Sequence, residues 1–326
     1  MGTRVKAEKK FTLKLAIHME PGRPTWLGYE RWAKKLEEAS NGRINIDILY
    51  SGVLGIEEWT NLKSHYSDIA RVFTMGMDPF PLHTVPALPF LMPSGENNLT
   101  ILNSLYDKYL YCEWKGVKVL WLGLMSPYNL HTTKKPVRKL EDFRGLKLQA
   151  HGLVAELVDI WGGTPITLIE PGESVSRQDI ANAHYSALKN GAIDGTVSTF
   201  EVTKDFQLYE VTKYHTYLNT VRDVNATIMN LETWGSLPQD IQEIFDNLNP
   251  WAQRELDTAQ KAESGEAEAL LKQKGHQMLE LSQEERLRWI KAAKPLNEEK
   301  ISMLESQGIR AREVAQELSR FSQLST

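Results

Sequence analysis

Residues 135–148 read KPVRKLEDFRGLKL and mark the point where the pattern of strands and helices starts again. Pro136 interrupts regular structure, because proline fixes φ and lacks the amide proton that a helix needs. From Leu146 an apolar strand pattern returns, and predicted helices alternate with further short strands up to residue 198. The chain is therefore expected to fold as two α/β units that join near residue 134.

The N-terminal side of this junction shows the same alternation. Residues 11–17 (FTLKLAI) and 44–50 (INIDILY) alternate apolar and polar side chains, which predicts two strands with one buried face each. Between them, residues 26–40 place apolar side chains at helical spacing. Strands that alternate with helices are typical of an open sheet with parallel strands.

Towards the C-terminus the sequence favours helices. The composition of residues 251–271 suits one long, mostly exposed helix, and Pro250 is expected to interrupt helical structure near its start. Residues 284–293 and 296–324 predict two more amphipathic helices that pack back on one unit.

Composition excludes several classes of protein. The 326 residues carry 38 Lys and Arg against 42 Asp and Glu, a net charge of −4, whereas nucleic-acid binding requires clustered positive charge. The single Cys112 excludes an intramolecular disulfide, a thiolate zinc site and an iron–sulfur cluster. No apolar stretch reaches the ~18 residues of a membrane helix. The N-terminal residues do not resemble an export signal, which leaves a cytosolic protein or a mature exported domain.

Motifs for catalysis and cofactor binding are missing from the sequence. There is no phosphate-binding glycine loop and no Gly-x-Ser-x-Gly elbow, and no two of the eight histidines stand four residues apart. We therefore predict no metal and no cofactor. An enzyme that uses His151 or His184 with a nearby serine stays open as the alternative to a binding protein.

Aromatic residues follow three of the predicted strands. Trp26, Tyr128 and Phe200 each lie shortly after a strand pattern ends. In open α/β sheets, ligands bind beyond the carboxyl ends of the strands. The three rings are therefore candidates to face a bound ligand.

The stretch at 135–148, together with residues 162–165 (GGTP) and 187–195 (ALKNGAIDG), resembles the solute receptors of tripartite ATP-independent periplasmic (TRAP) transporters, the DctP-like family. Shorter matches at 41–43 (NGR) and 234–238 (WGSLP) stand in the family's order. The resemblance covers roughly residues 11–250.

The resemblance implies an α/β, two-lobed periplasmic-binding-protein fold. Each lobe would be an open, mostly parallel sheet flanked by helices, with a long helix spanning the lobes and further helices at the C-terminus. The first lobe is expected to comprise residues 11–133 plus about 221–250, and the second 134–220 plus about 251–326.

The resemblance also implies a function. The chain would be a periplasmic receptor that binds a small organic acid in a cleft and delivers it to the membrane permease subunits of a TRAP transporter. The aromatic residues suggest an aromatic or cyclic acid. We expect no enzymatic activity and a monomer.

The resemblance assigns the candidate ligand-binding residues, of which Gln149 departs most from the family. Most relatives carry an arginine there that binds a substrate carboxylate, and Gln149 brings no positive charge. Arg222 is the candidate replacement. Trp26 would stack on the solute, Tyr128 and Asn129 would make polar contacts, and Phe200 would form an apolar wall. The remaining candidates are His18, His151 and Thr196.

Overall fold

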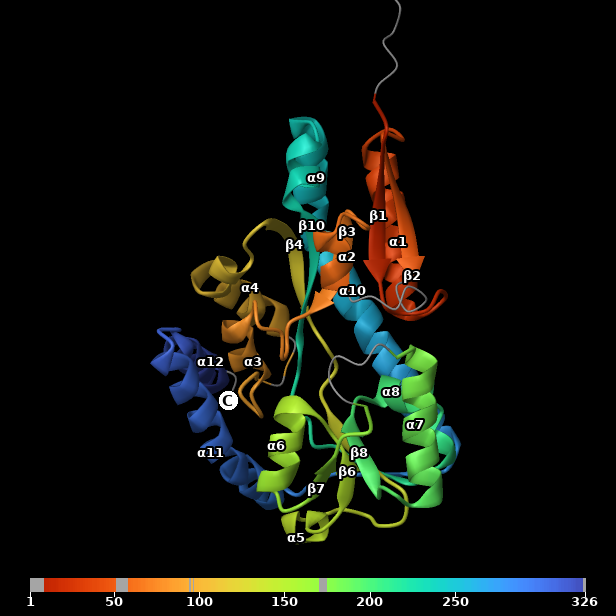
Figure 1. The fold of residues 1–326 in the computed structure, drawn as a ribbon, viewed down its shortest axis with the longest axis vertical. Coiled ribbons are helices and arrows are strands. Elements are labelled where there is room, and N and C mark those ends of the chain that lie inside the picture. Colours follow the sequence, from red (N-terminus) through yellow and green to blue (C-terminus); the bar gives the residue numbers. More distant parts are fainter. Residues whose placement is uncertain (1–8, 51–57, 94, 96, 170–174, 325–326) are drawn as a thin grey trace, which may run out of the picture. The chain divides into compact units, whose positions relative to one another are not determined.

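The computed structural model describes residues 9–50, 58–93, 95, 97–169 and 175–324 (Figure 1). Its strands are β1 (Phe11–Ile17), β2 (Ile44–Tyr50), β3 (Ile69–Phe73), β4 (Val117–Leu124), β5 (Asn129–Thr132), β6 (Lys147–Gln149), β7 (Thr164–Ile166), β8 (Gly195–Ser198), β9 (Tyr214–Thr216), β10 (Val224–Asn230) and β11 (Gln277–Leu279).

The α-helices are α1 (Pro24–Ala39), α2 (Glu58–Lys63), α3 (Thr84–Ala87), α4 (Asn98–Lys108), α5 (Leu140–Phe143), α6 (Gly152–Ile160), α7 (Arg177–Asn190), α8 (Phe200–Asp205), α9 (Leu231–Ser236), α10 (Gln239–Gln273), α11 (Gln283–Ser306) and α12 (Ala311–Leu324). Short 3₁₀ helices are η2 (Pro81–His83), η3 (Leu110–Glu113) and η4 (Leu208–Glu210).

The chain divides into two compact units. The described residues up to Val72, with Trp114–Gly123 and Ala226–Ala259, form the first unit, and the second contains Phe73–Glu113, Leu124–Asn225 and the chain from Gln260. This division differs from the expected lobes, which assigned residues 73–113 to the first. The difference arises because α3 and α4 pack against α12 within the second unit.

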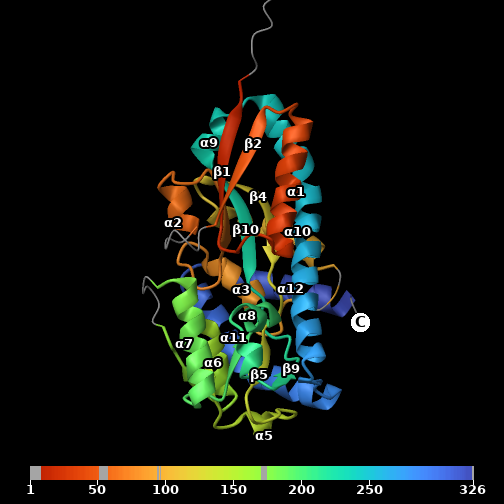
Figure 2. The same ribbon diagram turned by 90° about the vertical axis from the view of Figure 1, so that its right-hand side faces the viewer.

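The first unit is built on a five-stranded sheet in the order β2-β1-β3-β10-β4. β1 pairs in parallel with β2, Phe11 opposite Ile44 through Ile17 opposite Tyr50, and the expected strand boundaries are confirmed. α1 lies beside the first part of α10 (Figure 2). Gly28 permits this approach, because a Cβ atom there would lie 3.2 Å from Cδ1 of Leu256.

The second unit is built on a six-stranded sheet in the order β11-β9-β5-β8-β6-β7. β6 pairs in parallel with β7 and β8, and β9 pairs in parallel with β11. β5 runs antiparallel to both of its neighbours, β8 and β9. The mostly parallel sheet matches the expectation, whereas β5 and its direction were not anticipated from the sequence.

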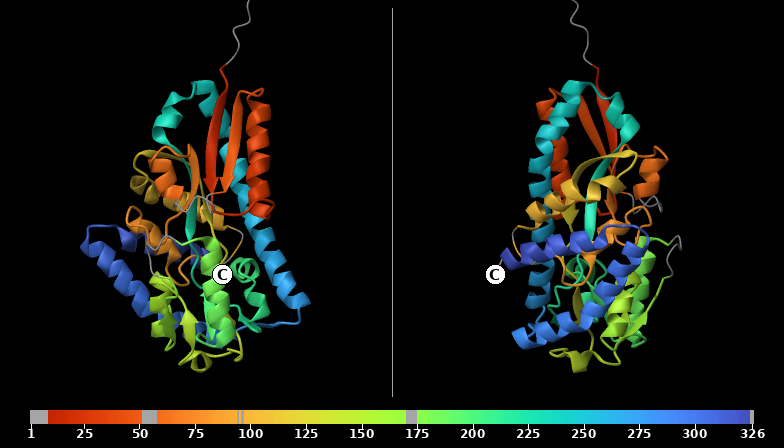
Figure 3. Two further views of the ribbon diagram at one scale, coloured as in Figure 1. Left: turned by 45° about the vertical axis from the view of Figure 1, so that its right-hand side comes forward. Right: turned by 90° about the vertical axis from the view of Figure 1, so that its left-hand side faces the viewer.

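Two helices continue through prolines at which the sequence pattern suggested a break. Pro250 lies inside α10 and Pro295 inside α11, so the expected helices at 251–271, 284–293 and 296–324 had wrong boundaries. A proline removes one backbone hydrogen bond and kinks a helix without necessarily ending it. The break falls instead beside Gly308, whose φ of 78° is the left-handed conformation that glycine adopts easily. α11 and α12, in blue, meet on either side of it (Figure 3).

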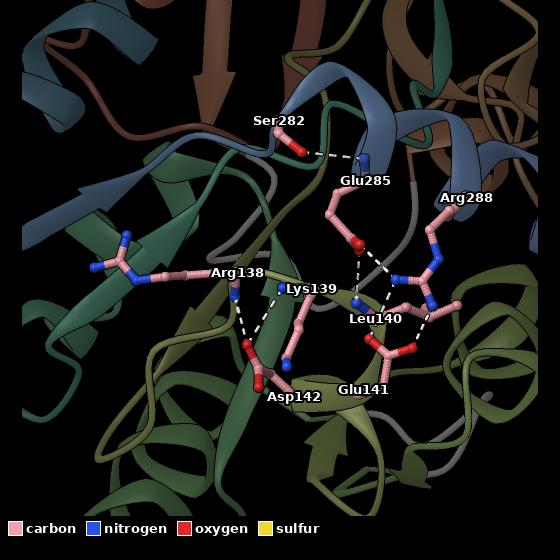
Figure 4. A network of polar contacts seen from close by, with 8 residues as sticks. All are labelled: Arg138, Lys139, Leu140, Glu141, Asp142, Ser282, Glu285 and Arg288. Carbon is pink, nitrogen blue, oxygen red and sulfur yellow. Dashed lines mark hydrogen bonds and ion pairs between the residues drawn. The ribbon is translucent and has the colours of Figure 1, made fainter.

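The stretch at 135–148 connects β5 to β6 and is held by α11 (Figure 4). The backbone N–H of Leu140 donates to Oε2 of Glu285 at 3.1 Å, and Arg288 pairs with Glu141 and Glu285. Asp142 accepts from the backbone N–H of Arg138 at 3.0 Å, which closes the turn before α5. The polar residues of this stretch therefore fix where α11 docks on the second unit.

The Glu141–Arg288 contact predicts a specific dependence of stability on pH. Hydrogen bonding to Arg288 lowers the pKa of Glu141 to about 2. A carboxyl whose pKa is depressed by folding stabilises the fold above its unfolded value, near 4.3, and this contribution is lost as pH falls towards 2. Glu141→Gln should therefore melt below the wild type at pH 7, by a small amount because the pair is exposed.

Melting temperatures recorded from pH 7 down to pH 3 test this expectation. The gap between the two proteins should narrow below pH 4.5 and should also shrink in 1 M salt, which screens exposed charges. A gap that stays constant over this pH range would show that the carboxylate charge is not what stabilises the contact.

Below this stretch lies an aromatic cluster that joins α5, α6 and α11. Phe143, Trp161 and Trp289 are each at most 2% exposed, and they meet edge to face with ring centroids 4.7 to 5.6 Å apart. Such contacts add to the free energy gained by burying the rings. The cluster is therefore part of the buried core of the second unit.

Candidate ligand-binding site

Several of the predicted ligand-binding residues lie at one end of the strands of the second unit's sheet. The parallel strands β6 and β8 end there with Gln149 and Ser198, and the antiparallel β5 begins there with Asn129. We call this side of the sheet the strand edge. Asn129 stands directly opposite Ser198 in the register. The pairing of strands thus brings together residues that are far apart in the sequence.

Gln149 is the last residue of β6, and its side-chain amide is held in one orientation. Oγ1 of Thr196, in β8, donates to Oε1 of Gln149 at 2.9 Å. Nε2 of Gln149 makes no hydrogen bond within the described part of the chain, although the residue is only 8% exposed. The site therefore offers a neutral N–H donor at the position where the resemblance predicts the ligand anchor.

Asn129 and Tyr128 are committed to the connections between strands. Asn129 donates from Nδ2 to the carbonyl of Pro127 at 3.1 Å and accepts from the backbone N–H of Asn219 at 3.0 Å. Burial, with the nearby charges of Asp223 and Glu201, raises the pKa of Tyr128 well above its usual value. Tyr128 is thus a neutral phenol at any physiological pH.

Arg222 lies in the segment between β9 and β10. Its Nε donates to the backbone carbonyl of Met125 at 3.0 Å, so part of the guanidinium is occupied by the main chain. The structure places this side chain beside the strand connection at Met125, and its role as a ligand anchor stays a prediction.

Phe200 follows β8 at the start of α8 and is 4% exposed. Its ring meets His131 edge to face, with centroids 5.3 Å apart, and also packs near His215 and Tyr217. The ring therefore covers a group of buried histidines as well as standing close to the end of β8.

Three histidines follow one another across this sheet. Nδ1 of His131 (β5) lies 2.8 Å from Nδ1 of His215 (β9), and Nε2 of His215 lies 2.8 Å from Nδ1 of His276, which directly precedes β11. At the inner end, Nε2 of His131 lies 3.2 Å from the carbonyl oxygen of Ser198. We call these three residues the histidine chain.

The surroundings of the histidine chain disfavour positive charge. Burial lowers the pKa of His131 to about 4. Burial, followed by the other two histidines, lowers that of His215 to about 2. Burial and the charges of Lys213 and Lys274 also lower the pKa of His276. The three rings of the histidine chain are therefore neutral at pH 7.

His151, at the N-terminus of α6, is the residue that the enzyme alternative would need. Burial lowers its pKa, and it lies close enough to His184 in α7 to lower the pKa of that residue as well. No hydrogen bond joins either histidine to a serine in the described part of the chain. The geometry therefore contains no activated nucleophile of the kind considered above.

The two remaining candidates lie in the first unit. Trp26 is buried in the core, 7% exposed, and its indole N–H donates to Oε1 of Glu30 at 2.7 Å. His18 follows β1, and its Nδ1 lies 3.8 Å from Oε1 of Glu58. Trp26 thus serves the packing of α1, and stacking on a solute stays a prediction for it.

Residues that the sequence did not single out also contribute buried polar groups near this edge. Glu201 is 4% exposed, and its Oε1 accepts hydrogen bonds from Ser126 and, at 2.9 Å, from Nε2 of Gln260. His131 and His215 were likewise missed. No local pattern marks these residues, because their partners are distant in the sequence and are brought close only by the tertiary fold.

Metal binding and membrane insertion find no support in the residues that the structure describes. Over these ranges no three His, Cys, Asp or Glu side chains are arranged to hold a metal ion. None of the described helices is both long and apolar enough to cross a bilayer.

Two α/β units, with neutral polar groups gathered where strands end, are the architecture of a protein that binds a small molecule. Residues 15–303 match the family of bacterial extracellular solute-binding proteins, family 7 (DctP), and the chain belongs to this family. A curated relative from Nostoc sp., a monocarboxylate 2-oxoacid-binding periplasmic protein, is 25% identical over 80% of this chain and 71% of its own length.

Solved structures have the same fold. A TRAP periplasmic solute-binding protein from Desulfovibrio salexigens, in an open complex, is 26% identical with a TM-score of 0.80, and the match covers 96% of both chains. A TRAP solute-binding protein from Rhodoferax ferrireducens, in complex with copurified benzoate, is 22% identical with a TM-score of 0.80 over 97% of this chain and 100% of its own. The expected receptor class and two-lobed fold are confirmed, and the enzyme alternative is set aside.

Proposed function

We propose that this protein is a periplasmic receptor for an aromatic or cyclic organic acid, which it binds at the strand edge of the second unit and delivers to the membrane components of a TRAP transporter. It acts as a monomer. The observation that carries the proposal is the oriented amide of Gln149, whose Nε2 can donate to a carboxylate oxygen.

The neighbouring groups support an organic acid with a ring. Phe200 is the aromatic residue that follows the end of β8, and Tyr128 precedes Asn129, the first residue of the adjacent β5. A relative of the same fold holds benzoate, and another relative is named for 2-oxo monocarboxylates. A single carboxylate suits a single neutral anchor better than a dicarboxylate, which would need a second donor group.

A ligand screen by thermal unfolding tests this function. A ligand that binds only the folded protein stabilises it by RT ln(1 + [L]/Kd), about 2.7 kcal/mol at one hundred times Kd, which raises the melting temperature by a few degrees. We expect such shifts with benzoate, mandelate or related ring-containing acids.

Matched neutral compounds are the control. Benzamide and benzyl alcohol keep the ring and remove the charge, so they should give much smaller shifts than benzoate. Shifts produced only by short aliphatic diacids would contradict the aromatic or cyclic assignment. Shifts produced only by uncharged compounds would contradict the assignment of an acid.

A further inference from the structure

The hydrogen atoms of the histidine chain can be assigned from its inner end. The carbonyl of Ser198 can only accept, so Nε2 of His131 carries a proton and Nδ1 of the same neutral ring is an acceptor. His215 must then donate from Nδ1 to His131 and accept at Nε2 from Nδ1 of His276. Each of the three hydrogen bonds is thus donated in the direction of Ser198. Nε2 of His276 is left as an acceptor at the half-buried end of the histidine chain.

This arrangement has room for one added proton. A proton that binds Nε2 of His276 makes that ring cationic. If both hydrogen bonds reverse, the charge moves to His131, and every bond still joins one donor to one acceptor. A second proton would place an N–H against an N–H between rings whose centroids are 5.1 Å apart.

The histidine chain lies in line with the predicted anchor. In the register of the sheet, Gln149 stands opposite Thr196, Thr196 opposite His131, and His131 opposite His215. Residues opposite one another point to the same face of a sheet, and neighbouring strands are about 4.8 Å apart. His131 therefore lies about 10 Å from Gln149 on the same face, with Thr196 between them.

Several other charged groups lie near the histidine chain. Lys213 and Lys274 oppose an added proton at His276. On α10, Glu268 accepts from the hydroxyl of Tyr217 and pairs with Lys272. On α8, Oε1 of Glu201 accepts from Ser126 and Gln260, whereas its buried Oε2 has no hydrogen-bond partner among the described residues. Glu280 follows β11 and acts on Tyr217. Across the described ranges no carboxylate hydrogen-bonds to any of the three histidines.

We propose that binding of an organic acid at Gln149 raises the affinity of the histidine chain for one added proton, which supplies the positive charge that the resemblance predicts for an arginine at this position. This inference rests on the proposed function. A carboxylate about 10 Å from the added charge stabilises it, and by linkage the proton strengthens binding of the carboxylate equally. At an effective dielectric constant of about 20 the coupling corresponds to roughly a tenfold change in affinity.

Calorimetric titration with benzoate between pH 5.5 and pH 7.5 tests the inference. Benzoate stays ionised in this range, and benzenesulfonate, whose charge does not depend on pH, serves as a second probe. Repeating each titration in two buffers that hold this pH range and differ in their heat of protonation, such as cacodylate and Bis-Tris, counts the protons taken up. For a coupling of about tenfold, we expect proton uptake that increases towards pH 5.5 and stays below about half a proton per ligand, and a Kd a few-fold lower at pH 5.5 than at pH 7.5.

His131→Gln separates charge from packing. The glutamine amide can still donate to the carbonyl of Ser198, but it cannot take up a proton. The variant should bind benzoate with much less dependence on pH, whereas the control His65→Asn, at an exposed histidine of the first unit, should behave as the wild type. A histidine that acts only through packing would weaken binding equally at every pH.

The outcomes distinguish this inference from the proposed function. Binding of benzoate by the wild type with no proton uptake and a constant Kd overturns the inference and leaves the receptor for aromatic acids intact. Absence of binding by either probe at every pH overturns both. The proton count is made on the wild-type protein, so the test does not depend on whether His131→Gln folds.

Discussion

Replacing Gln149 by glutamate is expected to abolish the binding of an organic acid while the protein still folds. The two side chains have the same shape, and Oγ1 of Thr196 can donate to the new carboxylate as it does to the amide. The substitution removes the Nε2 donor and places a negative charge against the ligand. Two like charges about 4 Å apart at an effective dielectric constant of about 20 repel by roughly 4 kcal/mol, so Kd should rise at least about one hundredfold.

Calorimetry with benzoate, together with the melting temperature of the unliganded protein, measures this effect. Gln283→Glu is the matched control, since it makes the same chemical change at an exposed position at the start of α11 in the same unit. The control should bind as the wild type does. Unchanged affinity in Gln149→Glu would show that the carboxylate does not bind at the end of β6.

The opposite substitution, Gln149→Arg, introduces the arginine that the resemblance to the family predicts at this position. Hydrogen bonds to a charged group contribute about 1.5–3 kcal/mol, against about 1 kcal/mol for a neutral pair. If the longer side chain fits, Kd should fall by up to about tenfold, and the dependence of Kd on pH should become weaker because the histidine chain is no longer the only source of charge.

Trp289→Ala is expected to destabilise the protein by about 3–5 kcal/mol. The ring is fully buried and packs edge to face on both Phe143 and Trp161, so its removal leaves a cavity the size of an indole. The cluster joins α11 to α5 and α6, and its loss should loosen the docking of α11 on the second unit.

Trp289→Phe tests the same site without the cavity. Nε1 of Trp289 is buried and has no hydrogen-bond partner among the described residues, so phenylalanine removes an unsatisfied donor and keeps most of the packing. Denaturant titration should place this variant far closer to the wild type than Trp289→Ala. Leu287→Ala, 60% exposed on the same helix, should change the free energy of unfolding by less than about 0.5 kcal/mol. A loss in Trp289→Ala no larger than that control would contradict the role of the cluster.

The sequence alone predicted the parts of the fold that local chemistry dictates. β1 and β2 have the boundaries that the alternation at 11–17 and 44–50 indicates, because each strand has one buried face. The stretch at 135–148 pointed to the family, and Figure 4 shows what it does in the fold: Glu141 and the backbone N–H of Leu140 contact α11. Proline was a poor guide, since α11 continues through Pro295.

The tertiary structure decided how the candidate site is built. Thr196 orients the amide of Gln149 across 47 residues of sequence, and His131 meets His215 across 84. Local propensity contains no information on such pairs, because only the register of β5, β6, β8 and β9 brings their side chains to one face. The sequence therefore determined that the chain is a receptor of this family, and the pairing of strands determined which polar groups can meet its ligand.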